Sequence, residues 1–268
     1  MKFPLANLKR VLSVCMGLMV LTAVTMAQNA TLAVVNGASF KPLFPLAPGS
    51  IASAFPVAAN GFTGVTQTDA PGVPLPTTLG GAQVLVNEVA APLFFASAGQ
   101  INFQVPGLTP LQPAEATVKV LVNGAEVARG KMSVFPASPG IFIADFNQTE
   151  PRPGAVLNQD GTPNTADNPA ARDTVLQVFC NGIGPLNATI ADGDHNPSDP
   201  PVTAQTAPEV WMGVFKANVE FAGAAPAFVG LSQVNVKIPN RAVLSGRQPL
   251  FLVANGLPSE AVSVWIEQ

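Results

Sequence analysis

The chain has 268 residues, of which 48% are hydrophobic and only 11% are charged, and it contains 27 prolines and 23 glycines. This length and composition allow one large domain or two ordinary ones with a sizeable core, and the scattered prolines argue against long helices, because proline lacks an N–H donor and clashes with the preceding turn. The formal net charge of −3, with no basic cluster after residue 10, argues against nucleic-acid binding, which needs a concentrated positive surface.

Residues 1–27 have the features of a signal peptide. Basic residues (Lys2, Lys9 and Arg10) precede an apolar run over 11–21, and Thr25-Met26-Ala27 supplies small residues before a cleavage site. The alternative is a membrane anchor, but the run is shorter than the roughly 20 residues that a spanning helix needs. We therefore expect a secreted, periplasmic or cell-surface protein with no transmembrane segment in the mature chain.

The segment Gln100–Pro106 predicts a strand with one apolar and one polar face. Ile101, Phe103 and Val105 alternate with polar residues, which places the two kinds of side chain on opposite sides of a sheet. A proline closes the run, where a missing N–H costs least. The same pattern recurs at Gln233–Pro239, which indicates that the chain contains an internal repeat.

Three further pairs of segments match in the same order along the chain. These are Ala91–Phe94 with Ala225–Phe228, Asn123-Gly124 with Asn255-Gly256, and Met132–Phe135 with Val262–Trp265. The repeat predicts two domains, at 29–138 and 139–268, after the leader at 1–27. Each domain has about the size of a sandwich domain.

Turn signals support short strands throughout both predicted domains. Asn123-Gly124 stands between the strand-like runs Val118–Val122 and Ala125–Val127, and Asn-Gly is the strongest short hairpin signal because both residues tolerate a positive φ. We expect Phe94, Phe103, Phe135 and Phe221 mostly in the core. The predicted fold class is all-β, with two tandem immunoglobulin-like β-sandwich domains after an N-terminal signal peptide.

A lone cysteine remains if the leader is cleaved, because Cys15 is lost with it. Cys180 ends the apolar run Val175–Cys180, so we interpret it as a buried small hydrophobe. A reactive thiol would need a nearby cation or a helix N-terminus, and the sequence shows neither.

One loop carries the best candidate for a metal site. Asp192, Asp194, Asn196 and Asp199 place oxygen ligands at alternate positions, as calcium prefers, but Pro197 and Thr203 stand where an EF-hand loop has glycine and glutamate. The loop is compatible with a surface calcium site and with a simple polar turn. No other metal, cofactor or catalytic site is predicted.

The only histidine, His195, lies in this loop. A serine triad would need a serine and an acid in contact with it, and the sequence contains no G-x-S-x-G or H-E-x-x-H motif. We therefore expect no enzyme, and a secreted hydrolase is kept only as an alternative.

Several segments resemble an acidobacterial family named "Solibacter uncharacterised C-terminal domain", which has the look of IPT/TIG-type immunoglobulin-like folds. The segments are Val35–Phe40, Leu46–Ile51, Leu75–Gly81, Gly99–Pro106, Ser138–Phe142, Asn168–Ala171, Gly182–Pro185 and Gly230–Val236. The resemblance implies an exported domain without an assigned biochemical role. Asn87-Glu88 departs from the Asn-Gly turn that the family would have there.

The sequence predicts a secreted or cell-surface, non-enzymatic β-sandwich module for adhesion, scaffolding or protein interaction. The partner would be an unknown extracellular protein or glycan, and sandwich edges and end loops are where such contacts usually form. The alternative is a carbohydrate-binding module, which predicts exposed aromatic rings in a row. With no tyrosine and only two tryptophans, the sequence offers little of this.

Overall fold

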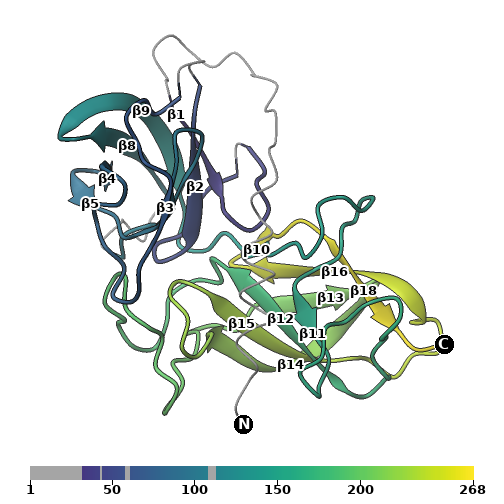
Figure 1. Cartoon of the computed structure of the whole chain (residues 1–268). Helices are drawn as coiled ribbons and strands as arrows, with labels where there is room; N and C mark the ends of the chain where they lie inside the picture. The colour runs from purple at the N-terminus through teal and green to yellow at the C-terminus, as the bar shows by residue number, and fades with distance from the viewer. Residues whose placement is uncertain (1–31, 43, 58–60, 108–112) are drawn as a thin grey trace.

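The computed structural model describes residues 32–42, 44–57, 61–107 and 113–268, and this part of the chain contains strands and turns but no helix. The all-β prediction is confirmed. The strands gather in two lobes, one from each half of the chain (Figure 1). No helix in the described ranges is long and apolar enough to cross a membrane. The predicted leader and Cys15 lie outside the described residues.

The first half, up to Ser138, forms two antiparallel sheets. One has the order β1-β2-β7-β6-β3, and the other β5-β4-β8-β9. In an immunoglobulin fold, strands A, B, E and D form one sheet and C, F and G the other. β1-β2-β7-β6 and β4-β8-β9 follow these two orders. The strands are β1 (Leu32–Asn36), β2 (Ile51–Pro56), β3 (Thr68–Asp69), β4 (Ala82–Val86), β5 (Val89–Ala90), β6 (Leu93–Ala96), β7 (Ile101–Gln104), β8 (Ala114–Val122) and β9 (Ala125–Val134).

The second half repeats this strand order. β10-β12-β15-β14 corresponds to A-B-E-D, and β14-β13-β16 continues into the other layer, where β16 also pairs with β17 and β18. The long strand β14 belongs to both layers, so the two sheets are joined. The strands are β10 (Gly140–Ile141), β11 (Val156–Leu157), β12 (Val175–Asn181), β13 (Glu209–Met212), β14 (Phe215–Ala224), β15 (Ser232–Lys237), β16 (Gly246–Ala254), β17 (Leu257–Pro258) and β18 (Val262–Ile266).

The two copies of the strand motif occupy equivalent places. β7 lies between β2 and β6, and β15 lies between β12 and β14. A register shift occurs opposite the same point of both strands, beside Asn102 in β7 and Asn235 in β15. The strand order of the two halves therefore agrees in detail, while duplication of one ancestral unit stays a prediction.

One of the matched segment pairs does not correspond in space. Phe103 of β7 and Val236 of β15 are equivalent residues. Phe103 pairs with Leu93, but Val236 pairs with Val219 of β14 and not with a residue of Ala225–Phe228. Ala225–Phe228 follows β14 in a loop. The short Ala-Pro segments thus match in composition alone. In the first half the segment covers the break between the separate strands β5 and β6, whereas in the second half the single strand β14 takes the place of both.

The predicted hairpin turn at Asn123-Gly124 is confirmed, and Asn255-Gly256 forms a turn of the same kind. Asn123 and Gly124 have φ values of 50° and 83°, and Asn255 and Gly256 have 49° and 77°, so each pair forms the positive-φ turn between its strands. Asn87 and Glu88, which depart from the family pattern, adopt φ values of 47° and 66° between β4 and β5. A glutamate there takes a conformation that favours glycine.

Each half has its own hydrophobic core. Ile101, Phe103 and Val105 of the first half and Val234 and Val236 of the second are fully buried. The other phenylalanines expected in the core, Phe94, Phe135 and Phe221, are only half-buried. The exact domain boundaries stay a prediction.

A third apolar cluster, which the sequence did not predict, joins the two halves. Ala38 and Ile51 of the first half pack in it with residues of the second half, namely Phe142, Ala155, Phe179, Ala225 and Leu231. The two cores are separate, but the lobes share this buried interface.

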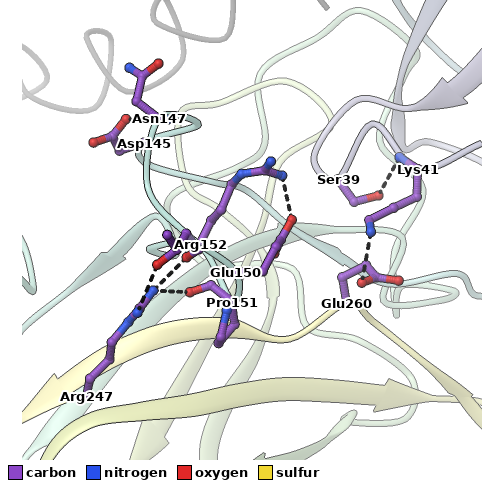
Figure 2. Close-up of polar contacts among 10 residues, drawn as sticks. Ser39, Lys41, Asp145, Asn147, Glu150, Pro151, Arg152, Arg247 and Glu260 are labelled. Carbon is purple, nitrogen blue, oxygen red and sulfur yellow. Dashed lines mark hydrogen bonds and ion pairs between the residues drawn. The ribbon is translucent and has the colours of Figure 1, made fainter. Parts of the chain in front are cut away.

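Buried hydrogen bonds reinforce the interface between the halves. Asn36 Nδ2 donates to Asn181 Oδ1 at 3.0 Å, and Asn181 Nδ2 donates to the Ile51 carbonyl oxygen at 3.0 Å. Asn36 and Asn181 are 2% and 0% exposed. At the rim, Lys41 Nζ lies 3.5 Å from Glu260 Oε2 (Figure 2). Since buried polar groups need partners, these bonds fix how the halves meet.

Candidate functional site

The predicted calcium loop serves the interface between the halves. The Asp192 carboxylate accepts the Gly107 N–H, with both oxygens at 3.0 Å. Asn196 is buried, and its Nδ2 donates to the carbonyl oxygens of Ala225 and Leu231. Asp194 and Asp199 are exposed. No group of three or more His, Cys, Asp or Glu that could hold a metal occurs in the described ranges. The calcium site stays an untested prediction.

The two candidate reactive side chains, His195 and Cys180, contact no catalytic partner among the residues that the structure describes. His195 is exposed, and its Nδ1 lies 3.0 Å from the Ala227 carbonyl oxygen. Cys180 is fully buried in β12, and burial raises the pKa of its thiol above the ordinary value. A thiol held in its neutral form is a poor nucleophile, so Cys180 acts as a core residue.

The most distinctive surface lies on the outward face of β13, β14 and β16, and we call it the aromatic face. Trp211 of β13 pairs with Phe251 of β16, and their rings stack with planes 6° apart and centroids 6.4 Å apart. Both side chains are half-buried. Their strand neighbours Val210 and Leu252 are fully buried, so the two rings point away from the core.

Charged side chains flank the ring pair on one side. Lys216 of β14 pairs across the strands with Trp211, and its Nζ lies 2.6 Å from Glu209 Oε1. The other carboxylate oxygen of Glu209 accepts the Trp211 Nε1–H at 3.3 Å. The hydrogen bond from Lys216, and then that from Trp211, hold the pKa of Glu209 below its ordinary value. The carboxylate therefore orients the indole through its N–H.

The second tryptophan is held differently. Trp265 of β18 pairs with Arg247, whose guanidinium carbon lies 5.9 Å from the centre of the indole ring. Arg247 also donates to the carbonyl oxygens of Thr149 and Pro151 (Figure 2). Asn164 donates to the Trp265 carbonyl and accepts its N–H. The Trp265 ring is thus covered by a guanidinium of this chain, whereas Trp211 stacks on Phe251.

The first half has no aromatic pair at the equivalent place. Leu85 of β4 pairs there with Lys119 of β8, and Lys119 forms an ion pair with Glu88. The same sheet therefore carries an aliphatic and charged surface in one half and two stacked rings in the other.

The sequence contains a signal for this surface, although it did not lead to the prediction of an aromatic pair. Trp211 and Phe251 each lie between two buried residues of their strand. This alternation predicts that the two rings point outward. The pairing of residues 209–212 with 250–253, however, brings together segments about 40 residues apart, and no local pattern reveals that the two rings meet.

Comparison with known proteins identifies no family. No family model matches the chain, and no curated protein matches it, so the resemblance to the Solibacter domain family stays a prediction. Matched solved structures include a chimeric titin Z1Z2 functionalized with a KLER exogenous peptide from decorin (11% identity, 89% of this chain and 99% of that chain, TM-score 0.21). Another is the titin Ig tandem domains A164-A165 (9%, 84% and 93%, TM-score 0.19).

A bacterial structure also matches, the C-terminal domain of the Streptococcus agalactiae AgI/II polypeptide BspA (10% identity, 88% of this chain and 99% of that chain, TM-score 0.20). TM-scores this low carry no argument about function. The assignment of the strand order to the immunoglobulin type rests on the sheets themselves.

Proposed function

We propose that this protein is a secreted or cell-surface, non-enzymatic binding module that attaches to extracellular carbohydrate through the aromatic face. Export is inferred from the sequence of residues 1–27. The proposal includes no triad-type hydrolysis, since His195 contacts a backbone carbonyl rather than a serine or an acid.

The stacked pair of Trp211 and Phe251 is the observation that carries the proposal. Two nearly parallel rings on a sheet surface offer a rigid apolar platform, and rigid aromatic side chains lose little conformational entropy on binding. The C–H-rich face of a sugar ring fits such a platform, while Glu209 and Lys216 beside it offer groups that bind hydroxyls.

A protein partner is the rival ligand for the same surface. Aromatic residues are enriched at protein interfaces, so the ring pair alone is compatible with adhesion through protein contact. A standard protein interface, however, needs about 800 Å² per partner. The aromatic face offers two rings, bordered by charged side chains that pair with each other, which favours a small, ring-shaped epitope.

Affinity electrophoresis of the purified protein in gels that contain soluble polysaccharides tests the proposal. We expect retardation by at least one polysaccharide, and we expect Trp211→Ala to weaken the binding at least about tenfold, because the loss of an aromatic hot spot typically costs about 2 kcal/mol or more. Leu85→Ala, at the equivalent place of the first half, is the matched control and leaves binding unchanged.

A conservative variant separates loss of the platform from loss of the fold. Trp211→Phe keeps a ring on β13 and should retain most of the binding, and far-UV circular dichroism should report the same strand content for all variants. Binding that survives Trp211→Ala in a folded protein would refute the proposed site. Binding only to proteins of the extracellular medium, and to no polysaccharide, would favour the rival.

A further inference from the structure

An open depression of about 410 Å³ lies at β14 and β15, next to the aromatic face. Its charged and polar lining residues come from β14, β15 and the loop that follows β15, together with one loop residue before β12. They are Asp173, Lys216, Asn218, Lys237, Asn240 and Arg241. Three cations and one carboxylate line the depression, and Glu209 pairs with Lys216 from its edge, so one positive charge, that of Arg241, is left without a carboxylate partner among the described residues.

The depression continues the aromatic face without a gap. Phe251, Trp211 and Lys216 lie in one row across three neighbouring strands, because each pairs with the next. Asn218 follows Lys216 on the same side of β14 and pairs with Lys237 of β15. Neighbouring strands are about 4.8 Å apart, so Trp211 on β13 and Lys237 on β15 lie about 10 Å apart across the sheet, a span that an oligosaccharide of two or more rings covers.

Arg241 is the cation with the most unused donors. Its guanidinium carbon lies 5.7 Å from the centre of the Phe215 ring, and no carboxylate of the described residues lies within 4.0 Å of it. Lys237, by contrast, lies 3.9 Å from Asp173, whose carboxylate also accepts a hydrogen bond from Asn240. A guanidinium stacked on an aromatic ring keeps its edge free for bidentate binding of a carboxylate.

The first half supplies a precedent within the same chain. Pro106-Gly107 follows β7 just as Pro239-Asn240 follows the equivalent strand β15. The Gly107 N–H binds a carboxylate, that of Asp192. In the second half, the equivalent Asn240 N–H has no hydrogen-bond partner among the described residues. The end of this strand thus binds a carboxylate in one copy and is open in the other.

We propose that the depression binds the carboxylate of an acidic saccharide, with a neighbouring sugar ring stacked on Trp211 and Phe251. This inference rests on the proposed carbohydrate binding at the aromatic face and names its substrate class as uronic-acid polysaccharide. Arg241 and the Asn240 N–H receive the carboxylate, Lys237 adds positive charge, and the Asn218 amide is placed to bind a hydroxyl.

The test compares each acidic polysaccharide with its own methyl ester, which keeps the rings and linkages but removes the charge. Oligosaccharides of alginate, polygalacturonate and hyaluronan, each in both forms, are titrated into the purified protein by calorimetry. We expect at least one acidic oligosaccharide to bind about tenfold or more tightly than its ester, since hydrogen bonds to charged groups contribute about 1.5–3 kcal/mol.

Charge-removing variants assign the effect to the depression. Arg241→Gln should reduce the preference for the acid over the ester to near unity, mainly by weakening the binding of the acid. Lys131→Gln, which removes an exposed cation of the first half, is the control and should keep the preference. Trp211→Ala should weaken both forms.

Three outcomes would refute this inference alone, and a fourth would also refute the proposed function. Equal binding of acid and ester, or an acid preference that survives Arg241→Gln, refutes the carboxylate site while the proposed function stands. Binding of acidic peptides with no binding of acidic saccharides refutes the substrate class. Failure of every saccharide, acidic or neutral, refutes the proposed function itself.

Discussion

Replacing Asn181 with alanine should destabilise the protein by about 3 kcal/mol, because it opens the polar contact at the centre of the interface. Asn181 is fully buried and makes two hydrogen bonds to the first half, from Asn36 Nδ2 and to the Ile51 carbonyl oxygen. The carbonyl keeps a second donor, the Gly37 N–H, at 2.9 Å. Asn36 Nδ2 keeps none among the described residues.

The magnitude follows from these two contacts. An unsatisfied buried donor costs about 1–3 kcal/mol, and an ordinary lost hydrogen bond costs about 1 kcal/mol more. Urea unfolding measures the loss, with tryptophan fluorescence reporting the second half, where both tryptophans lie, and circular dichroism reporting both halves. If the interface couples the halves, both signals shift to lower urea concentration together.

Asn187→Ala is the matched control for this experiment. The Asn187 amide also makes two hydrogen bonds, to Thr203 Oγ1 and the Ala204 carbonyl, but it is exposed. We expect its loss to cost less than about 1 kcal/mol, because water replaces the lost partners. Equal destabilisation by the two variants would refute the claim that the interface depends on buried polar contacts.

Three further predictions concern single side chains. Glu88→Gly should raise the free energy of unfolding by about 1 kcal/mol in urea titrations, because glycine removes the cost of a positive φ at 66°. The pKa of Glu209 is lowered in the folded protein, so its contacts with Lys216 and Trp211 are present at pH 4.5 and above and are lost as the pH falls through the folded-state pKa. The indole N–H resonance of Trp211 should therefore titrate below pH 4.5 in the wild-type protein. It should not titrate in Glu209→Gln. Cys180 should resist Ellman's reagent until urea unfolds the protein, and fast labelling in buffer would contradict its burial.

Local sequence patterns predicted the strands and turns well. Alternation in Gln100–Pro106 and Gln233–Pro239 predicted which side chains face each core, and Asn123-Gly124 predicted a positive-φ hairpin turn. These features depend only on residues that are neighbours in the sequence. The two-residue alternation of a strand and the backbone preferences of a turn can both be seen in a short segment.

The interface and the aromatic face could not be predicted in this way. Asn36 and Asn181 are 145 residues apart, and nothing near either residue indicates its partner. In the same way, Gln104 continues the polar side of β7 but is buried because its Oε1 accepts the Gly193 N–H of the second half. Long-range register decides both features, so they emerge only when the sheets are assembled.

The two indole N–H resonances of the protein give the most direct test of the proposed binding face. The chain has only two tryptophans, and a Trp265→Phe variant assigns the pair in a two-dimensional ¹H–¹⁵N spectrum. On titration with a polysaccharide that binds, we predict that the Trp211 resonance shifts and the Trp265 resonance, whose ring Arg247 covers, stays in place. Binding that moves only the Trp265 resonance, or neither, would contradict the proposed face.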